Sequence, residues 1–175
     1  SVTVNAAAIN VADADYTISF STGSNGRLLA GTSTITVTLP VGTTVGATAS
    51  TATVNGTSAT TVVNNSGNRT VTITVPSAES IGNSSAVTVV ITDQITNPSS
   101  AADYALEVKT SVETSNVSSN SYTIAAAATA VTISSVVPAP DTTRRTAQYT
   151  INITAAQAVS EDGTITVEFP SGTVV

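Results

Sequence analysis

The sequence predicts an all-β protein of the sandwich type, and three observations lead to that prediction. Apolar and polar residues alternate with period two over many short segments, as they do in half-buried strands. The apolar residues, 41% of the 175, are mostly Val, Ile and Ala, and Thr is abundant beside them; Val, Ile and Thr suit a pleated sheet. Clusters of Gly, Pro and Asn separate these segments at short intervals, and no convincing helical pattern interrupts them.

The first strands follow from alternation alone. Residues 2–4 read Val-Thr-Val, residues 16–20 alternate Tyr, Ile and Phe with Thr and Ser, and residues 34–39 alternate Ile, Val and Leu with Thr. Pro40 ends the third of these strands, because proline has no N–H to donate to a ladder.

Turn chemistry places the remaining strands. Asn55-Gly56 predicts a tight hairpin between strands at 52–54 and 59–63, because a type I′ turn needs positive φ at both central residues. Further strands are expected at 71–75, 86–92, 104–108 and 122–124. Residues 86–92 are apolar on both faces, which predicts a central strand. These nine strands make one complete sandwich.

Two stretches of the chain nearly repeat one another. Residues 34–45 match residues 164–175, and residues 14–18 match residues 147–151, at an offset of about 130 residues. An offset of domain size indicates a tandem repeat. We therefore expect a complete unit at 1–124, an extended linker at 125–130 and the first strands of a second unit at 131–175.

Three of the strands begin with the pattern Ala-x-Tyr, at Tyr16, Tyr104 and Tyr149. A tyrosine at a strand start whose hydroxyl bonds to nearby backbone is a corner device of immunoglobulin-like sandwiches, and we assign that role to all three. The Tyr-Thr-Ile strand starts, the Pro-x-Gly strand ends at Pro40 and Pro170, and Tyr104-Ala105-Leu106 resemble the immunoglobulin-like tandem repeats of bacterial and archaeal extracellular surface proteins. The chain has no Cys or Trp, so an antibody-type domain is excluded.

The partial second unit is expected to expose apolar residues. Three strands make a marginal fold with open edges. Either the missing strands follow in a longer chain, or another chain supplies them by strand addition. The second alternative predicts a homopolymer of this chain, with an assembly interface at Val131, Ile133, Ile165, Val167 and Phe169.

The composition disfavours several classes of function. The chain has no His and no Cys, which excludes the usual zinc sites and Ser-His-Asp or Cys-His nucleophiles. Five basic residues against eleven acidic ones disfavour nucleic acid binding, and no apolar run of membrane-spanning length occurs. No cofactor is expected, except calcium at Asp13 with Asp15; solvated turn carboxylates are the alternative.

Six Asn-x-Ser/Thr acceptor patterns occur in the sequence. They indicate either a glycosylated surface protein or exposed turn asparagines. The six asparagines are Asn55, Asn64, Asn68, Asn83, Asn116 and Asn152.

These observations predict a non-enzymatic extracellular protein whose like units build a surface filament, stalk or layer on the cell surface. The alternative is an adhesin or a carbohydrate-binding accessory module of a secreted protein, and glycan binding is left open. Paired carboxylates at Asp13/Asp15 or Glu161/Asp162 could still support glycoside hydrolysis, but acidic residues in such loops are normally solvated, and we do not expect an enzyme.

Overall fold

A computed structural model of the chain describes residues 1–126, 132–154 and 165–174. The contacts divide the chain into two compact units, Ser1–Ala127 and Ala128–Val175, and each is described here by itself. All regular structure in the described residues is β-strand.

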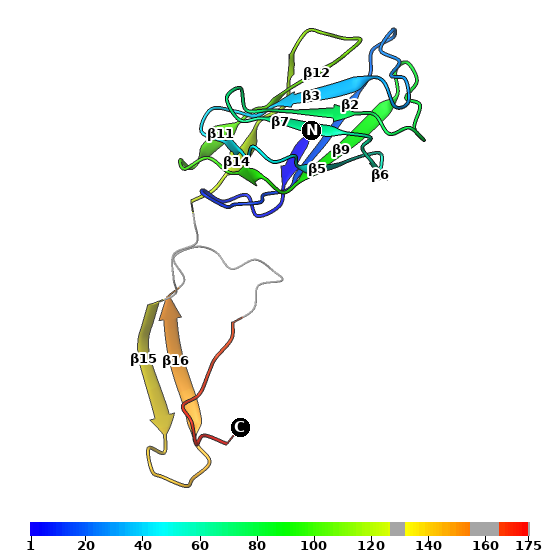
Figure 1. The fold of residues 1–175 in the computed structure, drawn as a ribbon. Helices are drawn as coiled ribbons and strands as arrows, with labels where there is room; N and C mark the ends of the chain where they lie inside the picture. The colour runs from blue at the N-terminus through cyan, green and yellow to red at the C-terminus, as the bar shows by residue number, and fades with distance from the viewer. Residues whose placement is uncertain (127–131, 155–164, 175) are drawn as a thin grey trace. The chain divides into compact units, whose positions relative to one another are not determined.

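The first unit contains two five-stranded antiparallel sheets (Figure 1). One sheet has the order β1–β2–β9–β5–β6, and the other has the order β13–β12–β3–β8–β7. The strands of the first sheet are β1 (Val2–Val4), β2 (Tyr16–Ser21), β9 (Ala86–Thr92), β5 (Thr51–Val54) and β6 (Thr57–Ser58). Those of the second are β13 (Val117–Ser118), β12 (Glu107–Thr110), β3 (Thr34–Thr38), β8 (Thr70–Thr74) and β7 (Val62–Asn65).

Two short antiparallel pairs complete the first unit. One joins β4 (Thr44–Val45) to β10 (Ile95–Thr96), and the other joins β11 (Ala102–Tyr104) to β14 (Tyr122–Ile124).

Alternate residues of the central strands form the core between the sheets. β3 and β8 bury every second residue, and so does β9, whose three buried positions are Val87, Val89 and Ile91. Buried residues from both sheets belong to one apolar cluster, so the two sheets face each other. The predicted all-β sandwich is confirmed.

The chain changes sheets just after the Asn55-Gly56 turn, where the sequence predicted a longer hairpin. Both residues have positive φ, +52° and +83°, as the tight turn requires. However, β6 has only two residues. The Ala59 amide still bonds to Ala52 in the first sheet, whereas the Thr60 amide bonds to Thr74 in the second. The strand expected at 59–63 is therefore wrong: β7 begins at Val62 and lies in the opposite layer.

The second unit contains one antiparallel hairpin, β15 (Thr132–Ala139) with β16 (Gln148–Thr154). Residues 164–169 repeat the sequence of the strand at 34–39, but residues 165–169 form no ladder within the described part of the chain. A strand needs a hydrogen-bonded neighbour, and alternation alone does not supply one.

The first residue of the linker predicted at 125–130 still belongs to the first unit. The Ala125 amide bonds to Ala7, and its carbonyl accepts the Ile9 amide, which makes a parallel bridge between Ala8 and Ala125. Residues 127–130 of the predicted linker lie outside the described residues.

Two glycines with positive φ give a matched test of the first unit. Gly42 has φ +93° and Gly56 has φ +83°, but an added Cβ would lie 3.3 Å from the Pro98 Cβ at Gly42 and would meet no atom within 4 Å at Gly56. We expect Gly56→Ala to lower the free energy of unfolding by about 1 kcal/mol through backbone strain, and Gly42→Ala to lower it further. Urea denaturation measures both, and equal losses would contradict a close approach to Pro98.

Candidate assembly surface

The β15–β16 hairpin has one apolar face. Opposite residues pair as Ile133 with Ile153 and Val136 with Ile151. Ile133 and Val136 are three residues apart, so regular alternation would place them on opposite faces. The register shift between Ile133 and Ser135 adds one residue and brings both onto the same face.

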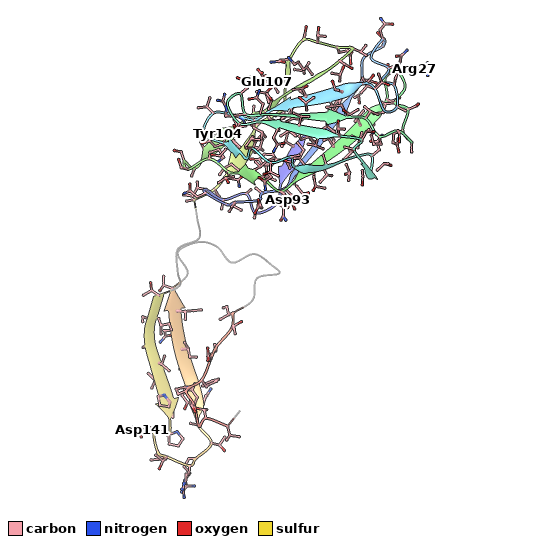
Figure 2. All side chains as sticks on the ribbon, viewed as in Figure 1. Arg27, Asp93, Tyr104, Glu107 and Asp141 are labelled. Carbon is pink, nitrogen blue, oxygen red and sulfur yellow. The ribbon has the colours of Figure 1, made fainter. Side chains whose placement is uncertain are left out.

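This face and the residues that follow it are strongly exposed in the second unit. The exposed fraction is 60% for Ile133, 50% for Val136 and 36% for Ile153. Farther along the chain it is 63% for Ile165 and 47% for Val167. Figure 2 shows side chains projecting from this hairpin.

Phe169 lies against the hairpin. Its ring meets Tyr149 edge-on, with the ring centroids 5.2 Å apart and the planes at 69°. This aromatic contact holds the segment at 165–169 near β16, although no ladder joins them in the described residues.

The hairpin repeats the pairing of the first two strands of the first unit. In that unit Val2 lies opposite Ile18, and Val4 lies opposite Tyr16. In the second unit Val136 lies opposite Ile151, and Pro138 lies opposite Tyr149. β15 therefore corresponds to β1, and β16 corresponds to β2.

Corresponding positions differ sharply in burial. Tyr16 is fully buried, whereas Tyr149 is 41% exposed. Ile35 and Val37 are fully buried on β3, whereas Ile165 and Val167, their matches in the repeat, are largely exposed. The second unit thus exposes the surface that the first unit uses as its core.

The predicted interface residues fall on this surface where they are described. Ile133, Ile165 and Val167 are exposed, and Phe169 is half-buried. Val131 lies outside the described residues. We call the described apolar set the assembly surface: Ile133, Val136, Pro138, Tyr149, Ile151, Ile153, Ile165, Val167 and Phe169.

The three predicted corner tyrosines have three different environments. Tyr104, labelled in Figure 2, donates its hydroxyl hydrogen to the carbonyl of Ser100, four residues upstream, at 2.9 Å. Tyr16 instead donates to the side chain of Asn97, 81 residues away, at 2.9 Å. The corner role expected of Tyr16 is therefore wrong, because its buried hydroxyl meets another loop. Tyr149 lies on the assembly surface.

Asn97 is the centre of a buried polar cluster that sequence reasoning missed. It is 2% exposed, and its Oδ1 accepts the Tyr16 hydroxyl. Its Nδ2 donates to the carbonyls of Ala6 and Ala8 at 3.2 and 2.9 Å, and its backbone N–H donates to Val11. One side chain therefore joins the loop after β1 to the loop after β10.

Tyr122 packs edge-on against Tyr16, with ring centroids 5.9 Å apart. Its hydroxyl is buried and has no hydrogen-bond partner among the described residues. Burial raises the pKa of Tyr122 well above its ordinary value, and the neighbouring Tyr16 adds to the rise. Burial also raises the pKa of Tyr16, while the nearby hydroxyls of Tyr122 and Thr43 partly oppose it.

These shifts predict loss of stability in alkali. The unfolded chain releases the two tyrosine protons near pH 10, whereas the folded chain keeps them to higher pH, so the stabilisation is complete below about pH 10 and falls as the pH rises. For Tyr122, whose shift is the larger, the slope should approach about 1.4 kcal/mol per pH unit above the ordinary tyrosine pKa. Urea denaturation between pH 9 and 12 measures it, and Tyr122→Phe should remove the share of Tyr122. A slope unchanged in that variant would contradict the assignment.

The two calcium candidates have separate partners. The Asp13 carboxylate accepts the backbone N–H of Gln94 at 2.9 Å, and that of Asp15 lies 3.5 Å from the Asn5 amide. The residues described by the structure contain no group of three or more His, Cys, Asp or Glu side chains placed to hold a metal ion. Calcium at Asp13 and Asp15 stays a prediction.

The acceptor asparagines differ in what their amides do. The Nδ2 of Asn64 has three acceptors, the carbonyls of Gly46 and Thr48 and the Ser50 hydroxyl, at 2.7 to 3.1 Å. A glycan on that nitrogen would displace these bonds. The other five acceptor asparagines are exposed: Asn55, Asn68, Asn83, Asn116 and Asn152.

A groove of about 530 Å³ opens on the first unit between the β1–β2 and β12–β13 edges. Ile18, Phe20, Val108 and Val117 supply its apolar lining. Glu113 also lines the groove, and its carboxylate accepts the Gly23 amide at 3.0 and 3.1 Å.

No protein-family model matches the sequence. No curated protein matches it either. Among solved structures, the chain is similar to the one described as the crystal structure of BslA, a bacterial hydrophobin. The identity is 18% and the TM-score is 0.45, over 72% of this chain and 96% of that chain. Across the described residues, no helix has the length and apolar character needed to cross a bilayer.

Proposed function

We propose that this chain is a non-enzymatic structural protein of the cell exterior, in which immunoglobulin-like units join copies of the chain into a surface filament, stalk or layer. The observation that carries the proposal is the assembly surface. Residues whose counterparts are buried in the first unit are exposed in the second.

The energetics favour covering this surface. Burying a Val, Ile or Phe side chain is worth roughly 1.5–3 kcal/mol. A two-stranded hairpin is marginal in water, and it becomes stable when further strands or a second layer cover its apolar face. Contact with another copy of the chain would supply further strands or a second layer. The first unit has few charged residues and many exposed Ser and Thr residues, so its stability comes from backbone hydrogen bonds between strands and from a core rich in Val and Ile.

Sedimentation velocity over a concentration series tests the proposal. The chain should self-associate, and electron microscopy of concentrated samples should show regular assemblies. The triple variant Ile133→Ser, Ile165→Ser, Val167→Ser should be monomeric.

The matched control replaces three exposed valines of the first unit, Val41, Val63 and Val117, by serine. These valines are 76%, 60% and 66% exposed, so replacing them removes a similar amount of exposed apolar surface, but from the first unit. The control should associate like the wild type. A wild type that stays monomeric, or a control that loses association equally, would overturn the proposal.

The groove on the first unit favours a second candidate function, an adhesin or carbohydrate-binding module. Its volume is in the range of ligand sites, and Phe20 supplies an aromatic ring in its lining. A glycan array tests this candidate: binding that Phe20→Ala abolishes while the fold is retained would support it over the structural role.

A further inference from the structure

The segment that follows the first strand of the first unit is bonded directly to the end of the last one. β1 is the first strand of that unit, and Ala125 comes directly after β14, its last strand. The Ala125 amide donates to the Ala7 carbonyl at 2.8 Å, and the Ala125 carbonyl accepts the Ile9 amide at 2.9 Å. Ala8 and Ala125 form a parallel bridge, so the two segments run in the same direction there.

Asn97 holds the same segment through other backbone groups. Its Nδ2 donates to the carbonyls of Ala6 and Ala8 at 3.2 and 2.9 Å. Its Oδ1 accepts the Tyr16 hydroxyl, and both side chains are buried. Asn97 therefore ties residues 6–9 to the core of the first unit.

The loop that contains this segment has an unusual backbone. Ala6, Asn10 and Asp13 have positive φ, +53°, +57° and +51°, and none of them is glycine. Such conformations cost free energy, persist only where the surrounding structure fixes them, and cluster at functional positions. The hydrogen bonds to residues 6–9 supply that fixation, so local preference does not explain the loop.

Tension along the chain would meet the bonds at Ala125 in shear. A pull from the N-terminal side draws residues 6–9 backward along their own direction, and a pull from the C-terminal side draws Ala125 forward. Because the two segments run parallel, they are drawn in opposite directions, and both bonds at Ala125 must break together. β1 is also loaded along its own axis against its antiparallel neighbour β2, whose ladder bonds lie across the pull.

From these observations we propose that residues 6–9, bonded to both Asn97 and Ala125, form a mechanical clamp that carries tension across the first unit. While the clamp is closed, tension passes from residues 6–9 to Ala125, and residues 10–124 are not stretched. The inference goes beyond the proposed function, because it concerns tension along one chain and not contact between copies. It depends only on residues within the first unit.

Single-molecule extension of the full chain, held at residues 1 and 175, tests the clamp. The second unit is a lone hairpin and should extend at low force. Opening of the first unit is recognised by its length, because the release of residues 10–124 adds roughly 400 Å. Ala125→Pro changes an exposed side chain and removes the amide that bonds to Ala7. This variant should open roughly 3- to 10-fold faster than the wild type at constant force.

The matched control is Ala126→Pro, the same substitution one residue later. Ala126 is exposed, and its amide has no hydrogen-bond partner among the residues that the structure describes. The control should therefore open at the wild-type rate. If Ala125→Pro also opens at that rate, or the control opens as fast as Ala125→Pro, the bonds at Ala125 do not carry the tension.

Ile35→Ala separates the clamp from general stability. This substitution weakens the core, but the core is still packed when the clamp breaks, so opening under force should stay near the wild-type rate although the variant unfolds at lower urea. Asn97→Ala frees the carbonyls of Ala6 and Ala8 and should open faster under force than Ile35→Ala does, which provides a test that does not depend on a proline variant folding. Faster opening of Ile35→Ala than of Asn97→Ala, or a wild type that extends without a resolved force step, would overturn the proposal.

Discussion

Replacing Ile35 by alanine is expected to lower the free energy of unfolding of the first unit by roughly 2–5 kcal/mol, whereas Ile165→Ala should change it by less than about 0.5 kcal/mol in dilute solution. The two isoleucines occupy matching positions of the repeat, in the segments Thr-Ile-Thr-Val. Ile35 is fully buried between Ile73 on one neighbouring strand and Thr110 on the other, and Ile165 is 63% exposed. Alanine therefore leaves a cavity at one position and removes exposed surface at the other.

Urea denaturation followed by circular dichroism measures the first effect, and sedimentation velocity measures the second. At high concentration Ile165→Ala should weaken self-association, while Ile35→Ala should leave association of the remaining folded molecules unchanged. Equal losses of stability in dilute solution would show that Ile165 is buried within the single chain, contrary to the exposure found here.

Much of the first unit could be predicted because alternation reports burial directly. The strands expected at 16–20, 71–75 and 86–92 correspond to β2, β8 and β9 within one residue at each end. Alternation does not report the partner of a strand. The strands β4, β6, β10 and β13 have two residues each, too few to show a pattern, and they are defined by pairing with a neighbouring strand. The chain crosses from one sheet to the other between Ala59 and Thr60, and this crossing shows only in which backbone carbonyls their amides bond to.

Part of the assembly surface could be predicted from the sequence. The repeat located Ile165 and Val167, because residues 164–169 copy the strand that contains Ile35. The match between β15 and β1 was missed, because Val136 and Pro138 correspond to Val2 and Val4 through their strand partners and not through a shared sequence pattern.

The burial of Asn97 could not be predicted from the sequence, for a different reason. Asn97-Pro98 indicates a loop, where asparagine is normally exposed. Its burial depends on Tyr16, 81 residues earlier, and on two carbonyls of the loop after β1. No local pattern encodes a side chain whose partners come from distant segments.

The second large effect is expected at this side chain. Asn97→Ala should lower the free energy of unfolding of the first unit by roughly 2–4 kcal/mol, because it leaves the buried Tyr16 hydroxyl without an acceptor and frees the carbonyls of Ala6 and Ala8. Ala6 and Ala8 are not fully buried, so water can replace part of what their carbonyls lose. Urea denaturation gives the total, and hydrogen exchange should show faster opening of residues 5–11.

Two identical substitutions separate the hydrogen bond from the packing. Tyr16→Phe and Tyr122→Phe each remove one buried hydroxyl from rings in edge-on contact. Tyr16→Phe leaves the Asn97 Oδ1 unpaired and should cost about 1–3 kcal/mol. Tyr122→Phe removes a hydroxyl without a partner among the described residues, so stability should be unchanged or higher. If both variants lost the same stability, the Tyr16–Asn97 bond would not be what joins these two loops.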